Sequence, residues 1–89
     1  MEDKIRFDDD AIRELHRAKC FFDTIGKGRE FLDDFENQIE RIKAMPMAFQ
    51  IRYREVRIIN FSRFSFTIHY TFIHNKVIIL NILNQFQEY

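Results

Sequence analysis

Four arginines lie close together in the second half of the chain. Arg52, Arg54, Arg57 and Arg63 fall within twelve positions and are opposed only by Glu55. A planar guanidinium binds carboxylate or phosphate through paired hydrogen bonds, so this run of residues suits contact with an anionic macromolecule. Period-2 spacing puts the first two arginines on one face of a strand and the third on the other face, unless a bulge intervenes. Without a second signal, we favour the simpler interpretation of solvated strand positions.

The distribution of charge supports the same region as the place for an anionic partner. Residues 1–45 hold nine Lys or Arg against twelve Asp or Glu, whereas residues 46–89 hold five against two. The first half is therefore net −3 and the second net +3, although the whole chain is neutral. Such a basic half attracts acidic segments and raises their association rate.

Two other groups of residues could do chemistry. His69 lies at an outward position of an alternating stretch and is the side chain there that could titrate near neutrality as a general base. We favour a solvated or hydrogen-bonded histidine over this role. His16 and Cys20 have a spacing that could ligate a metal, but no other Cys is present, so we expect no metal and no cofactor. For residues 8–10, three aspartates, we favour a helix cap over a metal site.

Two helices and several strands must position these side chains. Apolar residues recur every three or four positions in two stretches, which predicts two amphipathic helices. A stop at Gly26 and another at Pro46 make them an antiparallel hairpin. The stripes predicted to be buried are Ala11, Leu15, Ala18, Phe22 and Ile25 in the first helix, and Phe31, Phe35, Ile39, Ile42 and Met45 in the second.

The remaining stretches indicate strands. Residues 4–7 alternate as a short first strand, and residues 55–59, 64–72 and 77–83 are predicted as a meander. The last of these is apolar on both faces, so it belongs in the middle of the sheet or needs a cover. We predict an α+β fold of order β-α-α-β-β-β, with the helical hairpin on one face of an antiparallel sheet. The other face, with Ser65, Thr67, His69 and Thr71, is expected to be the open side where function resides, unless it resides at the sheet edge.

Length and composition limit the alternatives. Residues 1–89 are expected to form one domain, with a core rich in the eleven phenylalanines. The longest wholly apolar run, residues 77–80, is far too short to cross a bilayer. With one cysteine and no apolar leader, we expect a cytoplasmic protein.

The element order and several local phrases resemble the RelE/ParE superfamily of bacterial toxins from type II toxin-antitoxin modules, the plasmid stabilisation protein family. The resemblance covers nearly the whole chain. Residues 55–59, 63–70 and 77–83 look like the family's "V-R", "R-F-P-Y-x-I-x-Y" and "V-x-I-L-x-I-x-H" strands. The other matching positions are Phe7, Ala11, Leu15, Phe31, Ile39 and Pro46.

The resemblance implies a growth-inhibiting toxin that is neutralised by a cognate antitoxin. RelE-like members cleave mRNA on the ribosome, whereas ParE-like members poison DNA gyrase. The family's last strand commonly runs into His-x-x-Arg, but the matching residues here are Asn84 and Gln87, which supply neither an acid nor a positive charge. This departure favours the ParE-like branch or a degenerate antitoxin-binding member, and it leaves open whether the chain is an enzyme.

Candidate contacts with a target or with RNA are Arg52, Arg54, Arg57, Arg63, Asn84 and Gln87, with His69 as the weak catalytic candidate. The alternative enzyme is an mRNA endoribonuclease that uses His69 with Arg57 or Arg63. A helical antitoxin tail in a groove is the expected partner. Self-association is left open, since the second apolar face of the last strand needs a cover.

Overall fold

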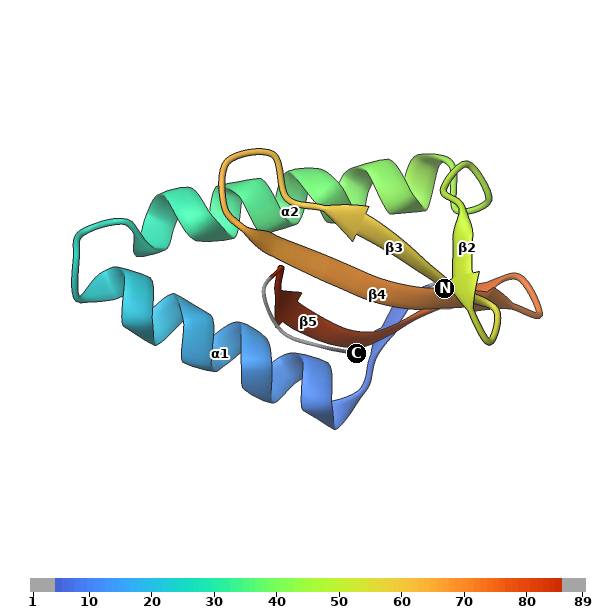
Figure 1. The fold of residues 1–89 in the computed structure, drawn as a ribbon, viewed down its shortest axis with the longest axis horizontal. Coiled ribbons are helices and arrows are strands. Elements are labelled where there is room, and N and C mark those ends of the chain that lie inside the picture. The colour runs from blue at the N-terminus through green and yellow to red at the C-terminus, as the bar shows by residue number, and fades with distance from the viewer. Residues whose placement is uncertain (1–4, 86–89) are drawn as a thin grey trace.

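A computed structural model describes residues 5–85 of the chain. Within these residues, two helices and five strands follow one another in the order strand, helix, helix, strand, strand, strand, strand (Figure 1). Neither helix has the length and apolar character that a membrane span requires within these residues. The elements are β1 (Ile5–Phe7), α1 (Asp9–Asp23), α2 (Gly28–Ala44), β2 (Ile51–Tyr53), β3 (Val56–Asn60), β4 (Phe66–Ile73) and β5 (Lys76–Asn84).

All five strands form one mixed sheet in the order β1-β5-β4-β3-β2. The predicted meander is confirmed in β3, β4 and β5, which pair antiparallel. The first strand departs from the predicted antiparallel sheet, since Ile5 pairs with Val77 in parallel register. The long strand β5 therefore lies between β1 and β4, as its two apolar faces predicted. Strand β2 was not predicted, because three exposed residues give too short a pattern to register as a strand.

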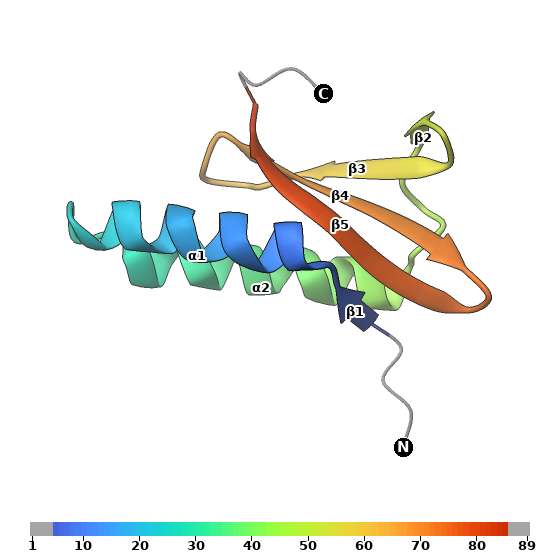
Figure 2. The same cartoon turned by 90° about the horizontal axis from the view of Figure 1, so that it is seen from below.

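Both helices cover one face of the sheet, as Figure 2 shows. Asp8 is the N-cap residue of α1 and has extended backbone angles, but its side chain makes no cap hydrogen bond, so the predicted cap is wrong in that detail. The chain leaves α1 through Gly26, whose φ of +72° is the left-handed conformation that glycine adopts at little cost. Ile25 and Met45, the last predicted members of the two stripes, are exposed because they lie beyond the last helical residue.

The core is largely aromatic. The ring of Phe31 lies 4.9 Å from that of Phe22, 5.2 Å from that of Phe61 and 5.3 Å from that of Phe66, measured between centroids. Offset-stacked and edge-to-face pairs of this kind stabilise a fold beyond the area that they bury. Such interlocking joins α1, α2 and β4, and it compensates for the short chain.

Candidate functional site

We call the sheet face opposite the helices the outer face. The sequence predicted that β4 would offer an open polar surface there, and this prediction is wrong. Of the four predicted outward residues, Ser65 is exposed just before β4. Thr67, His69 and Thr71 are all buried, with His69 only 1% exposed. Tyr53 of β2 covers part of His69, since its ring reaches past β3 to lie 6.0 Å from the His69 ring, between centroids.

His69 is held by hydrogen bonds at both ring nitrogens. Its Nδ1 lies 3.0 Å from the Tyr53 hydroxyl, and its Nε2 lies 3.0 Å from Thr67 Oγ1. The Thr67 hydroxyl donates to the Leu83 carbonyl at 3.3 Å, so it accepts from His69 Nε2–H, and Nδ1 accepts from Tyr53. Burial lowers the pKa of His69 and keeps the ring neutral. A buried, neutral ring with both nitrogens engaged is poorly placed to act as a general base on a macromolecule.

The structure separates the four arginines. Arg52 is exposed within β2, and Arg54 is exposed in the turn that follows it. Arg63 is exposed in the loop between β3 and β4, so Arg54 and Arg63 flank opposite ends of β3. Arg57 pairs across the strands with Tyr70 on the helix side, and its guanidinium donates to the Phe49 and Met47 carbonyls. Of the four, only Arg52 and Arg54 are near neighbours with exposed side chains.

Tyr70 is fully buried on the helix side of β4, as its place in the alternation predicted. Its hydroxyl donates to the Pro46 carbonyl at 2.7 Å. Burial raises the pKa of Tyr70 to about 12, against the opposing effect of the Arg57 charge. This phenol therefore anchors the segment after α2 and is not available to stack on a base.

The β3–β4 loop is held by a buried carboxylate that the sequence did not single out. Asp34 of α2 accepts hydrogen bonds from the backbone N–H of Ser62 at 3.1 Å and of Arg63 at 2.7 Å, and from Gln38 Nε2 at 2.9 Å. Burial raises the pKa of Asp34, but these hydrogen bonds outweigh it and hold the pKa below its ordinary value. An acidic residue on the buried stripe of a helix was the signal that could have revealed this contact.

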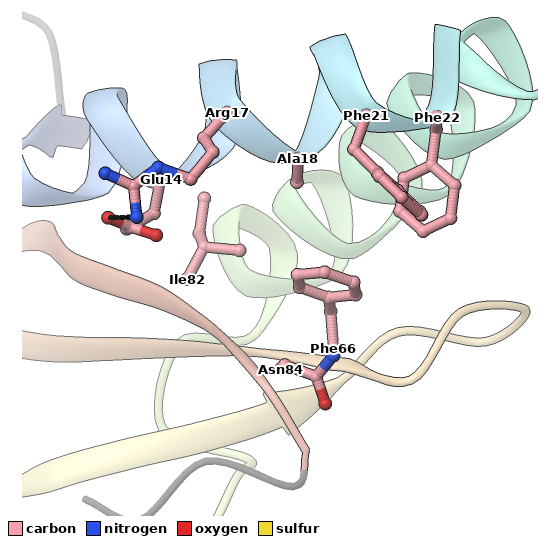
Figure 3. A pocket seen from close by; sticks show the side chains of 8 residues that line it. All are labelled: Glu14, Arg17, Ala18, Phe21, Phe22, Phe66, Ile82 and Asn84. Carbon is pink, nitrogen blue, oxygen red and sulfur yellow. Dashed lines mark ion pairs between the residues drawn. The ribbon is translucent and has the colours of Figure 1, made fainter. Parts of the chain in front are cut away.

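A groove opens between α1 and the adjoining ends of β4 and β5, and we call it the α1–β5 groove (Figure 3). Its volume is about 630 Å³. Phe21 is 59% exposed at its edge, and Glu14 and Arg17 form an ion pair of 3.4 Å there. Asn84, a predicted contact residue, belongs to this groove, whereas Gln87 lies outside the described residues. The lining residues are Glu14, Arg17, Ala18, Phe21, Phe22, Phe66, Ile82 and Asn84.

The sequence did not predict this groove, because Phe21 lies just beside the predicted apolar stripe of α1. Within residues 5–85 no group of three His, Cys, Asp or Glu side chains is placed to hold a metal. His16 Nε2 and Cys20 Sγ lie 3.8 Å apart on the exposed side of α1, where no third ligand of that kind joins them among the described residues.

The sequence and the fold were compared with those of known proteins. No family model and no curated protein sequence matches the chain. Among solved structures, a chain of the intact E. coli RelBE toxin-antitoxin complex matches with a TM-score of 0.72 at 14% identity, over 99% of this chain and 100% of that one. A chain of the chromosomal ParDE TA system from P. aeruginosa matches with a TM-score of 0.70 at 14% identity, over 92% and 95%.

The resemblance that the sequence suggested is thus confirmed at the level of the fold. The likeness runs over nearly the full length of both chains in each pair, so it includes the helical hairpin and the sheet together. The chain has the fold found in the RelBE and ParDE toxin-antitoxin structures.

Proposed function

We propose that the protein is the toxin of a type II toxin-antitoxin module of the RelE/ParE superfamily and that a cognate antitoxin neutralises it. The observation that carries the proposal is the full-length likeness of fold to chains of two toxin-antitoxin systems. The diffuse strand motifs in residues 55–59, 63–70 and 77–83 support the same assignment independently of the structure.

The α1–β5 groove is the proposed binding site of the antitoxin. Its floor is apolar, with Ala18 and Ile82 buried, and the exposed ring of Phe21 stands at its edge. An amphipathic helix can bury a row of apolar side chains in such a groove while its polar side meets the rim. At the rim, Glu14 and Arg17 offer one charge of each sign for orienting the incoming segment.

For the target, we propose DNA gyrase in preference to ribosome-bound mRNA. Cleavage of RNA needs accessible groups that activate the 2′-OH and protonate the leaving oxygen. The outward positions of β4 are Thr67, His69 and Thr71, which are buried and carry no positive charge, and Asn84 stands where the family commonly has histidine. A toxin that acts by binding does not need these groups.

Induction of the gene alone in a bacterial host tests the proposal. We expect growth arrest with altered DNA supercoiling and an SOS response, and rescue by the neighbouring antitoxin gene. Arrest with new, codon-phased mRNA 5′ ends would instead establish the ribonuclease. Expression of folded protein without arrest would contradict toxicity and leave a degenerate member that only binds antitoxin.

A matched pair of variants tests whether the antitoxin binds in the α1–β5 groove. Phe21→Ser should abolish rescue by the antitoxin while leaving growth arrest intact, because Phe21 is exposed and contributes little to the core. Ile12→Ser changes an equally exposed apolar residue of α1 that does not line the groove and should leave rescue unchanged.

A further inference from the structure

The β3–β4 loop carries two exposed residues, Ser62 and Arg63, between two anchored phenylalanines. Phe61 is buried, and its backbone N–H donates to the Phe66 carbonyl at 2.9 Å, which closes the loop. Phe64 packs against the aromatic core on the other side. The loop is therefore fixed at both ends, and a fixed loop loses less conformational entropy on binding a partner than a mobile one.

A buried glutamine of α2 sets the direction of the hydrogen bonds beneath this loop. Gln38 is 1% exposed, and its Oε1 accepts from the Arg41 guanidinium at 2.9 Å. Its Nε2 donates to Asp34 Oδ1 and to Ser62 Oγ, each at 2.9 Å. A reversed amide would set its oxygen against the Asp34 carboxylate and its NH₂ group against the guanidinium. The observed orientation is therefore the one that satisfies all three partners.

The fixed amide determines what the Ser62 hydroxyl can do. Its oxygen accepts from Gln38, so its own hydrogen is left to donate, and within residues 5–85 the hydroxyl forms no second hydrogen bond. The guanidinium of the adjacent Arg63 forms no ion pair with any described residue. One neutral and one charged donor thus follow each other in an exposed, fixed loop, and such donors together bind an oxyanion.

The acidic side chains of α2 do not neutralise these donors. The Asp34 carboxylate lies beneath the loop, but it accepts from the backbone N–H groups of Ser62 and Arg63 and from Gln38. Glu30 is exposed one turn before Asp34 on the same side of α2, and among the described residues no ion pair joins it to Arg63. The exposed acids beside Asp34 in sequence, which a helix directs to other sides, are Asp33 and Glu36.

The number of charges selects the kind of partner. Arg63 is the single cation in residues 60–66. Binding to nucleic acid depends on several cations that follow the phosphate backbone, whereas one guanidinium pairs with one carboxylate through two hydrogen bonds. We propose that Arg63 and Ser62 bind the side-chain carboxylate of a Glu or Asp on the protein target of the toxin, with Gln38 as a positioning residue. This inference rests on the proposed function in one respect, that the partner is the target.

The test uses the full chain labelled with ¹⁵N and, as the probe, a short synthetic peptide of glutamate with blocked ends. We expect saturable shifts of the Arg63 Nε–H signal and of the loop amides, with a loss of affinity as NaCl is raised. Arg63→Gln should weaken binding at least about tenfold, and Ser62→Ala about fivefold. Arg63→Lys should restore only part of the affinity, because an ammonium group cannot form the paired bonds.

Two controls address the other charges. Arg29→Gln removes another exposed arginine, and Glu30→Gln removes the exposed acid on the Asp34 side of α2. Neither change should weaken binding of the peptide.

The variant Gln38→Met tests the positioning role. It removes the amide and leaves the Ser62 hydroxyl free to donate to the Asp34 carboxylate instead. We expect Gln38→Met to weaken peptide binding about as much as Ser62→Ala, and the double variant to bind no more weakly than either single variant. Losses that add in the double variant would contradict the positioning role, since a general loss of stability would add to the loss of the hydroxyl.

Three results would overturn the proposal. One is peptide-induced shifts that lie outside the β3–β4 loop, or no shifts at all. Another is equal binding of a lysine peptide by the unmodified chain, which decides the matter even if a variant folds poorly. The third is a shift of the Arg63 signal by an RNA oligonucleotide but not by the glutamate peptide, which would reassign the loop to nucleic acid.

Induction in a bacterial host distinguishes this inference from the proposed function. Peptide binding at Arg63 without growth arrest by the unmodified chain would contradict the toxin and keep the carboxylate site. Full growth arrest by Arg63→Gln at the same protein level would keep the toxin and overturn the assignment of the carboxylate to its target.

Discussion

Replacing Asp34 by asparagine should destabilise the protein by about 3 kcal/mol. The Asp34 carboxylate accepts three hydrogen bonds, from Ser62 N, Arg63 N and Gln38 Nε2. In Asp34→Asn one oxygen becomes an NH₂ group, which cannot accept from the Arg63 N–H, and the remaining bonds lose the assistance of charge. A buried donor left without an acceptor costs roughly 1–3 kcal/mol, and bonds to a charged group contribute roughly 1.5–3 kcal/mol each.

Urea unfolding measures the change. A domain of this size has a stability of roughly 4–13 kcal/mol, and with m near 1 kcal/mol/M the midpoint should fall by roughly 2–3 M. Asp33→Asn is the matched control, since Asp33 is the exposed neighbour on the same helix. A midpoint for Asp34→Asn within error of that control would refute the reasoning.

The effect of Asp34→Asn on stability should also depend on pH. The pKa of Asp34 is lower in the folded than in the unfolded protein, so the folded state binds the proton less well. Its contribution is therefore fully present above the unfolded pKa, about 3.9, and is lost as pH falls through the folded value. The difference in stability between the unmodified protein and Asp34→Asn should shrink below about pH 4. A difference independent of pH down to complete acid unfolding would contradict the role of the charge.

Three further predictions concern His69, Tyr70 and Phe21. Because burial lowers the pKa of His69, the unfolded state takes up the proton first as pH falls, so stability should decline below about pH 6.5. The variant His69→Gln should flatten this dependence in urea unfolding at successive pH values. Tyr70→Phe should lose about 1 kcal/mol with its hydrogen bond of 2.7 Å, and it should remove the tyrosine that titrates near pH 12 in ultraviolet absorbance. Phe21→Ser should weaken antitoxin binding at least tenfold, on the order of the transfer free energy of a partly buried ring, in calorimetric titration, while thermal unfolding stays unchanged.

The sequence predicted the helices and the meander because these depend on periodic burial, which is visible residue by residue. Alternation in residues 64–72 placed Ile68 and Tyr70 correctly on the helix side. It placed His69 on an open surface because alternation distinguishes two faces but does not reveal what covers each of them. The cover includes Tyr53, which belongs to a strand too short to leave a pattern.

The candidate site was less predictable for a similar reason. The four arginines are close in sequence but lie apart in the structure. Strand β3 separates Arg54 from Arg63, and the Arg57 guanidinium donates to the backbone carbonyls of Met47 and Phe49 in the segment after α2. The contacts of Asp34 with the β3–β4 loop join residues far apart in sequence, so an acidic residue on the buried stripe of a helix indicates a partner without showing which one it is. Of the predicted contact residues, Asn84 lines the α1–β5 groove, but no pattern in the sequence indicated the exposed Phe21 ring at the edge of that groove.

The parallel pairing of β1 with β5 bears on the order in which the chain assembles. Ile5 meets Val77, so this contact closes a loop that contains nearly every described residue, whereas the α1–α2 and β4–β5 hairpins close over short distances. Long loops cost more entropy to close and are formed late unless many contacts reward them, and β1 offers only three residues. We therefore expect β1 to dock after the transition state, so that substitutions at Ile5 accelerate unfolding and leave the refolding rate unchanged in stopped-flow kinetics. Before β1 docks, the backbone of Val77 and Ile79 would lie at a sheet edge, and self-association during folding would begin there.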